Sequence, residues 1–263
     1  MRCKNCDLTI SIESNFCSTC GCKVIRNRLT IKNLLEHFTE TFLNYDNKFL
    51  QTFIKLFTKP ESVINGYIDG IRKKYVDVIS YFAIAITISG LQLFILNKFF
   101  PEAVDFTSIA QKGTEQLSKN VFDFIKEYQS IAMMINVPVY ALISKIVFIK
   151  ENKFKYNYTE HLVIFMYILA QTSIINSILI GIGGALGFSI GILSMIFGPL
   201  QLIYSGYCLK RVFDLDLKNL AFRTFIFIVV LAIFSILFTA IFILIVKNNG
   251  GLEAFIEAQK NGK

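Results

Sequence analysis

The sequence predicts an all-α membrane protein: a five-helix transmembrane bundle that follows a small cysteine-rich module and amphipathic linker helices. Three observations lead to this fold class. Hydrophobic residues make up 54% of the 263 residues and charged residues only 17%, which lies outside the usual balance of soluble domains. Five stretches are long and apolar enough to cross a hydrocarbon core of about 30 Å. Four cysteines form two CxxC pairs within the first twenty residues.

The N-terminal module, residues 1–26, has the cysteine spacing of a zinc ribbon. The two pairs, separated by ten residues, are Cys3 with Cys6 and Cys17 with Cys20. Four thiolates close a tetrahedral shell around one structural Zn²⁺ per chain and leave no position for a substrate. A redox CxxC would need a βαβ pattern, and disulfides would need an oxidising compartment. Cys22 and Cys208 are expected to be spectators.

Residues 27–77 are expected to form amphipathic helices, because apolar residues recur there at helical spacing with polar residues between them. Pro60 ends the first helical unit. Two arrangements are open. The apolar face lies on the inner membrane surface beside anionic lipid, or it packs on the protein's own cytoplasmic loops. The aromatic residues that would enter the lipid interface are Phe38, Phe42, Phe49 and Phe53.

The transmembrane domain, residues 78–246, contains the five spans, and residues 247–263 form a tail. The expected spans are 78–96, 131–149, 162–182, 185–209 and 224–246. Basic loops stay in the cytoplasm, and a cytoplasmic N-terminus places 20 of the 27 Lys and Arg residues inside and seven outside. The charges therefore predict an inner (cytoplasmic) membrane protein with a cytoplasmic N-terminus, an external C-terminus and contact with an anionic inner leaflet.

A second motif lies between the ribbon and the first span. Its residues are Asp46, Phe49, Leu50, Thr52, Leu56, Pro60, Tyr67, Gly70, Arg72 and Tyr75. Together with the CxxC…CxxCG ribbon, this motif resembles an uncharacterised bacterial membrane family, domain of unknown function 3667. Two positions depart from the family pattern, since Cys22 replaces a usual Gln and Val78 a common Pro. The five-span layout is also similar to the Yip domain family of membrane-trafficking and organising factors, in topology more than in residues.

Two further groups of residues are candidate sites. The first is a membrane-surface or partner patch near one helix face, for which an ordinary interfacial anchor is the alternative. Its residues are Tyr67, Gly70, Arg72 and Tyr75. The second is a pair of overlapping GxxxG steps, which predicts a close-packing face on the fourth span. Its residues are Gly183, Gly187 and Gly191.

Nothing in the sequence nominates an enzyme. The histidines, His37 and His161, are isolated, and the sequence has no GxSxG, HExxH or P-loop motif. The net charge of +8 is explained by the positive-inside rule, which makes nucleic acid an improbable partner. We therefore expect a scaffold or organising protein of the inner membrane whose zinc ribbon docks a protein partner.

The alternative is a small-molecule or lipid transporter, or a subunit of one. The two hypotheses differ in what they require of the bundle. A transporter needs a polar cavity at the bilayer midplane, around Gln171, Asn176 and Gln201. A scaffold needs a dry bundle and an exposed apolar or charged patch on the ribbon.

Overall fold

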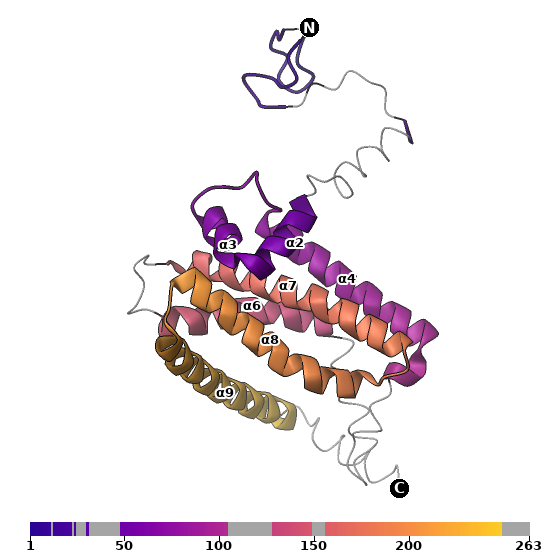
Figure 1. Ribbon diagram of the computed structural model, residues 1–263, viewed down its shortest axis with the longest axis vertical. Helices are drawn as coiled ribbons and strands as arrows, with labels where there is room; N and C mark the ends of the chain where they lie inside the picture. Colours follow the sequence, from indigo (N-terminus) through magenta and orange to yellow (C-terminus); the bar gives the residue numbers. More distant parts are fainter. Residues whose placement is uncertain are drawn as a thin grey trace. The chain divides into compact units, whose positions relative to one another are not determined.

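The computed structural model divides the chain into two compact units, Met1–Asn47 and Lys48–Lys263. The residues that the structure describes are 1–11, 13–22, 24, 30–31, 48–104, 128–148 and 156–248, with side chains to residue 237. The described part of the second unit consists of helices and connecting loops, with no strand (Figure 1), so the predicted fold class is confirmed. In the first unit, Arg2 and Thr9 form an antiparallel bridge.

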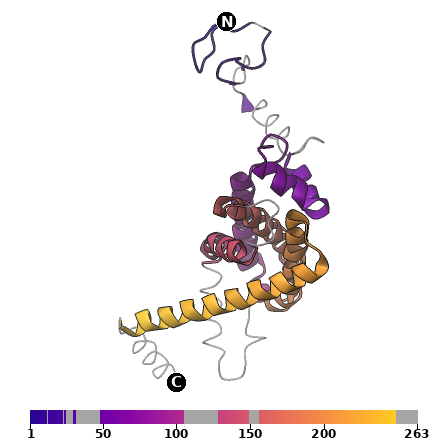
Figure 2. The same cartoon turned by 90° about the vertical axis from the view of Figure 1, so that its left-hand side faces the viewer.

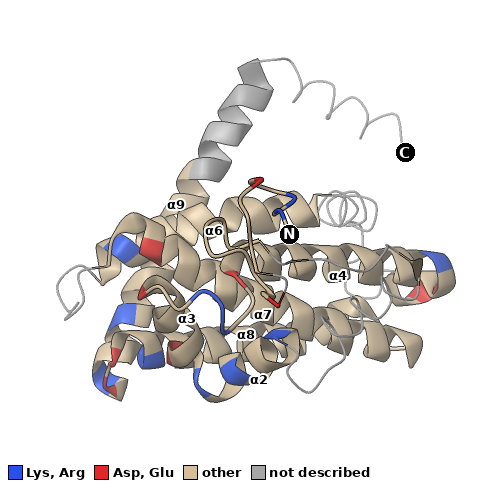
Figure 3. Cartoon of the chain, turned by 90° about the horizontal axis from the view of Figure 1, so that it is seen from above, with Lys and Arg blue, Asp and Glu red and all other residues tan. Residues whose placement is uncertain are grey.

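Five helices of the second unit are long and apolar enough to cross a membrane, as the sequence predicts. They are α4 (Val78–Phe99), α6 (Gln129–Val147), α7 (Tyr158–Ala185), α8 (Ile190–Phe213) and α9 (Leu217–Asn248). Their charged residues lie near helix ends, and the middles of α4, α7 and α8 carry none (Figure 3). This distribution is typical of membrane-spanning helices, because a charge at the bilayer centre is costly.

Helix α7 is the central helix of the bundle. It packs against α4, α6 and α8, whereas α9 contacts α6 and α8 and runs out beyond the other helices (Figure 2). Asn157 begins α7 with a capping box, in which its side chain accepts from the Glu160 N–H and the Glu160 carboxylate accepts from the Asn157 N–H. The side chains of Ile164, Tyr167 and Ile168 are almost completely buried. The core of the bundle therefore lies around the first half of α7.

The fourth span begins later than predicted. Residue 185 ends α7, and α8 begins at Ile190, where the Ser189 side chain accepts a hydrogen bond from the Ile192 N–H. Gly187 lies between the two helices with a φ of +88°, a conformation that only glycine adopts without strain. This residue separates the two helices. A short 3-10 helix, η1 (Pro101–Val104), follows α4 and is not anticipated from the sequence.

Two shorter helices, α2 (Lys48–Thr58) and α3 (Pro60–Ile68), form a cap over one end of the bundle (Figure 1). In α2, Thr52 and Leu56 are fully buried. Phe49 packs against Tyr81 with ring centroids 5.6 Å apart, and Phe53 also contacts the core. Part of the predicted linker therefore packs on the protein itself rather than on lipid.

The opposite edge of α2 is exposed and apolar. Leu50 and Ile54 are 50% and 47% exposed. That α2 contacts a lipid interface stays a prediction. Leu50 and Ile54 would make this contact, because Phe49 and Phe53 pack on the protein. Phe38 and Phe42, which the sequence also assigns to the interface, lie outside the described residues.

Candidate functional site

The two CxxC pairs of the first unit lie on two turns with the same hydrogen bonding. In the first turn, the Asp7 N–H donates to the Cys3 carbonyl over 2.9 Å. In the second, the Gly21 N–H donates to the Cys17 carbonyl over the same distance. Asp7 and Gly21 both adopt positive φ, 56° and 68°. Each turn therefore needs a left-handed residue directly after its second cysteine, which Asp tolerates and Gly favours.

The equivalence of the two turns explains the fifth cysteine of the module. The Cys3 N–H donates to the Leu8 carbonyl, and the Cys17 N–H donates to the Cys22 carbonyl, each over 2.9 Å. Cys22 thus occupies the position that Leu8 holds in the first turn. It closes the turn through its backbone, and its sulfur is not part of the cluster of the other four.

The four predicted sulfur atoms all lie within 4.8 Å of one another. Cys3 Sγ is 3.7 Å from Cys20 Sγ, and Cys6 Sγ is 3.7 Å from Cys17 Sγ. A tetrahedral ion with four sulfurs at about 2.3 Å requires sulfur–sulfur separations of about 3.8 Å. A disulfide requires about 2.05 Å. The spacing therefore fits a tetrahedral metal ion rather than cross-linked cysteines.

Backbone N–H groups point at the sulfurs of the second turn. The Cys22 N–H, and then the Asn5 side chain, lower the pKa of the Cys20 thiol to about 6. The N–H groups of Cys20 and Thr19 likewise lower the pKa of Cys17. Hydrogen bonds to sulfur stabilise the thiolate, which is the form that binds metal.

Cys6 behaves in the opposite way. The Leu8 N–H lowers its pKa, but desolvation and the thiols of Cys20, Cys3 and Cys17 raise it, to about 12 overall. Four sulfurs this close cannot all become anions without a compensating cation. A divalent ion would supply that charge and displace the remaining protons.

The residues of the predicted surface patch do not share a helix face. Helix α3 ends at Ile68, because Gly70 has a φ of +95°, and the remaining patch residues follow in the loop to α4. Tyr75 is only 6% exposed, and its hydroxyl lies 3.4 Å from Ser62 Oγ. The expectation of one helical face is therefore wrong, since a left-handed glycine ends the helix inside the group.

The aromatic members of this group instead join the cap to the bundle. The Tyr67 ring packs edge-on against Tyr167, with centroids 5.9 Å apart, and Arg72 lies over the outer face of Tyr67 at 5.3 Å. The Tyr167 hydroxyl donates to the Val76 carbonyl over 2.8 Å. Of the patch residues, Arg72 remains exposed, as do its neighbours Lys73 and Lys74, and their contact with a headgroup or a partner stays a prediction.

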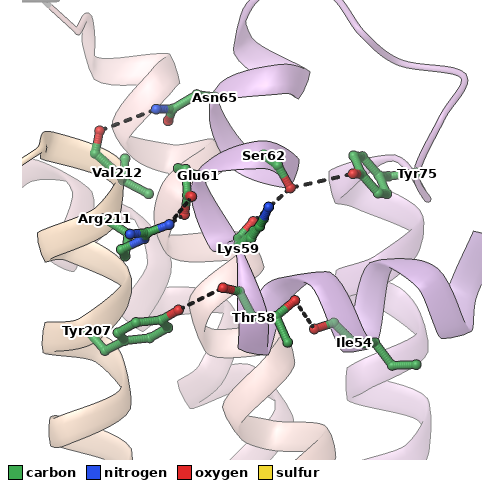
Figure 4. Close-up of polar contacts among 10 residues, drawn as sticks. All are labelled: Ile54, Thr58, Lys59, Glu61, Ser62, Asn65, Tyr75, Tyr207, Arg211 and Val212. Carbon is green, nitrogen blue, oxygen red and sulfur yellow. Dashed lines mark hydrogen bonds and ion pairs between the residues drawn. The ribbon is translucent and has the colours of Figure 1, made fainter.

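Polar contacts between α3 and α8 fix the other side of the cap (Figure 4). Arg211 Nε donates to Glu61 Oε2 over 3.1 Å, and its second bond to the same carboxylate makes the pair bidentate. Asn65 Nδ2 donates to the Val212 carbonyl over 3.3 Å. The cap is therefore held on α8 by side chains as well as by apolar packing.

The three glycines predicted to form a GxxxG face do not lie on one helix. Gly183 belongs to the last turn of α7, Gly187 to the connecting loop, and Gly191 to α8. A Cβ at Gly187 would meet nothing within 4 Å, whereas one at Gly183 would lie 2.6 Å from Leu193 Cδ1. The predicted face on the fourth span is wrong because Gly187 breaks the helix. The close packing of glycine occurs at the end of α7 instead.

A cavity lined by amide and hydroxyl side chains, together with apolar ones, lies among α4, α6, α7 and α8; it is called the polar cavity below. Its volume is 390 Å³. Two of the three polar residues singled out in the sequence contribute to it, and Asn176 Nδ2 donates to Gln201 Oε1 over 3.1 Å. The lining residues with amide or hydroxyl side chains are Ser89, Gln92, Tyr128, Gln129, Asn136, Tyr140, Thr172, Ser173, Asn176, Ser177 and Gln201.

Gln171, the third residue singled out, does not line this cavity. It is fully buried, accepts a hydrogen bond from the Tyr81 hydroxyl and donates to the Phe53 carbonyl over 3.2 Å. Its role is to connect α4 and α7 to the cap. Sequence reasoning missed Ser89, Thr172 and several other lining residues. The sequence feature that could have identified them is the recurrence of small polar residues at helical spacing within apolar spans.

Comparison with known proteins yields one family. No curated protein and no solved structure matches the chain, and the likeness to the Yip domain family remains a prediction. Residues 46–90 match the family described as "Protein of unknown function (DUF3667)". This segment includes the cap and the first half of α4, so it contains the contacts that fasten α2 and α3 to the bundle. This segment is similar to the DUF3667 family, as the resemblance of its residues predicts.

Proposed function

We propose that the helical bundle binds a small molecule or a lipid between its spans, as a transporter or as a subunit of one. The observation that carries this proposal is the 390 Å³ cavity and its lining of amide and hydroxyl groups. Polar groups inside a membrane domain are costly unless they pair with one another or serve a ligand.

Paired cysteine substitutions test the cavity. Ser173 lines it, whereas Ser144 is completely buried elsewhere in the bundle. In native membranes, a small water-soluble maleimide should label the Ser173→Cys variant and leave Ser144→Cys unlabelled, with the modified peptide identified by mass spectrometry. Mass spectrometry separates the introduced thiol from the native cysteines. Equal protection of both thiols would mean that the cavity is closed to water and that the proposal fails.

A second candidate function is that of a scaffold or organising protein with a docking module. The observation that favours it is the exposure of two large apolar side chains in the cysteine module, Leu8 at 48% and Phe16 at 60%. Aromatic side chains such as that of Phe16 are enriched in protein interfaces. Replacing both with Asp should abolish one defined crosslinked band in native membranes, while Thr9→Asp retains it. A crosslinking pattern unchanged by the double variant would exclude these residues as anchors.

The metal and the membrane orientation belong to the same proposal. One structural Zn²⁺ would be held by the four thiolates described above. Binding of this ion would supply most of the folding free energy of so small a unit. The module would lie in the cytoplasm, where thiols stay reduced. The C-terminus would lie outside the inner membrane. The exposed cations of the loop after α3 would face the anionic inner leaflet. No catalytic role is proposed.

A further inference from the structure

We propose that the ligand of the bundle is an uncharged amphiphile, with a hydroxyl-bearing headgroup in the polar cavity and an acyl chain in an apolar cavity beside it. The inference rests on the proposed function and adds the chemical class of the ligand.

The headgroup is assigned from the chemistry of the polar cavity. No Lys, Arg, Asp or Glu is among its lining residues in the described part of the chain. A phosphate or an ammonium group would enter without a compensating charge, which is strongly unfavourable away from water. A side-chain amide both donates and accepts hydrogen bonds, and the same is true of a hydroxyl group. The lining therefore matches a neutral headgroup with several hydroxyls, such as a sugar or another polyol.

Two lining residues, Asn176 and Gln201, are hydrogen-bonded to each other through their side-chain amides and offer a way to hold such a headgroup. The bond between Asn176 and Gln201 uses one donor and one acceptor. Each amide keeps further capacity, an oxygen lone pair on Asn176 and N–H donors on Gln201. A hydroxyl group placed against this pair can donate to one residue and accept from the other. A purely apolar molecule could form no hydrogen bond with the two amides.

The acyl chain is assigned from a second cavity that adjoins the first. It has a volume of 110 Å³ and lies among α6, α7, α8 and α9. Both cavities are lined by Tyr140, Leu169 and Gln201, so only these side chains need to separate them. Beyond this point the lining is largely apolar and includes Phe165 and Phe227, whose rings stack with centroids 5.9 Å apart. A single molecule that extends from one cavity to the other must therefore be polar at one end and apolar at the other.

Some residues that line the apolar cavity also reach the outer surface of the helices. Two of its lining residues, Leu202 on α8 and Ile228 on α9, are 62% and 47% exposed. In a membrane-spanning bundle this surface faces lipid chains. An acyl chain can therefore enter sideways from the bilayer, which a water-soluble ligand would not need.

Photocrosslinking of the full-length protein in phosphatidylcholine vesicles tests the assignment. The probe is a glucosyl diacylglycerol with a diazirine in one acyl chain. It should label the peptide that contains Phe227, and unlabelled glucosyl diacylglycerol should compete while phosphatidylglycerol should not. Gln201→Leu should reduce the saturable labelling about tenfold, the effect of losing roughly one hydrogen bond. Gln51→Leu, on α2 outside both cavities, is the matched control and should label normally.

The outcomes separate this inference from the proposed function. Equal competition by phosphatidylglycerol would overturn the neutral headgroup, and full competition by free glucose would overturn the acyl chain. Either result leaves the bundle a ligand-binding domain. Absence of saturable labelling by the probe overturns the amphiphile. If, in addition, the maleimide does not label the Ser173→Cys thiol, the proposed function fails together with the amphiphile.

Discussion

The Tyr204 hydroxyl of α8 donates a hydrogen bond of 3.0 Å to the carbonyl oxygen of Leu56 in α2. Leu56 lies in the last turn of its helix, where carbonyl groups have no partner within the helix. Tyr207, one turn further along α8, donates to the Thr58 carbonyl over 3.1 Å. Two tyrosines of α8 thus supply donors to carbonyl groups in the last turn of α2. These bonds hold the end of α2 beside α8.

Removing the Tyr204 hydroxyl should loosen the cap. Tyr204→Phe leaves the buried Leu56 carbonyl without this donor, and we expect the free energy of unfolding to fall by about 1–2 kcal/mol. Thermal unfolding in detergent, followed by near-ultraviolet circular dichroism, measures the change. Tyr158→Phe is the control, because the Tyr158 hydroxyl bonds the Pro138 carbonyl at an exposed site over 3.3 Å. Equal losses in both variants would contradict the special role of Tyr204.

Substitution of Gly70 should weaken the connection between the cap and α4. Its φ of +95° is unfavourable for any residue with a Cβ, so Gly70→Ala should destabilise the protein by about 1–2 kcal/mol. A Cβ at Gly70 would meet nothing within 4 Å, so the cost comes from the backbone alone. Gly90→Ala, also without a neighbour within 4 Å but inside α4, should be neutral or stabilising. The same thermal measurement compares the two, and a neutral Gly70→Ala would contradict the left-handed backbone.

Adding a methyl group at the end of α7 should disturb the packing of α4 and η1. A Cβ at Gly184 would lie 2.8 Å from Leu96 Cδ2 and 3.4 Å from Ala103 Cβ. Leu96 is 1% exposed and has little room to move. Gly184→Ala should therefore cost about 1–3 kcal/mol, whereas Gly198→Ala, with open space at its Cβ, should not. Melting temperatures that match in the two variants would exclude this close packing.

Zinc content is expected to depend on the four clustered thiols and not on Cys22. The purified protein should contain about one zinc per chain by elemental analysis. Cys17→Ser should abolish zinc binding, and Cys22→Ser should retain it, because Cys22 serves its turn through its backbone. Zinc should dissociate as the pH falls, since protons compete for the thiolates. Zinc retained by the Cys17→Ser variant would refute the assignment.

The distribution of Lys and Arg predicts a cytoplasmic N-terminus and an external C-terminus. A reporter that is active only in the cytoplasm should function when fused at Met1 or near Lys153, and should fail when fused after Lys263. The reason is the excess of Lys and Arg on one side of the five spans, 20 against seven. Activity at the C-terminus would mean that the number of crossings is not five.

The local features of the chain were predictable from the sequence. Cysteine spacing identifies the four residues that come together, because two residues between cysteines allow one tight turn to direct both sulfurs at one point. Long apolar runs identify the five spans, because burial in hydrocarbon requires about twenty apolar residues. The motif of residues 46–75 predicts the similarity of this segment to the DUF3667 family. Each of these signals depends on residues close together in the chain.

The positions of residues far apart in the chain were decided only by the tertiary structure. Helical periodicity shows that Phe49 and Phe53 share an apolar face, but it does not distinguish lipid from the core of the bundle as the surface that covers this face. Glycine spacing suggests a packing face at Gly183 and Gly187, but the left-handed backbone of Gly187 ends that helix. Likewise, Asn176 and Gln201 are simply polar residues in separate spans until the packing of α7 against α8 brings them within 3.1 Å. A sequence records which side chains prefer to avoid water, whereas the partner that each one meets is determined by how whole helices fit together.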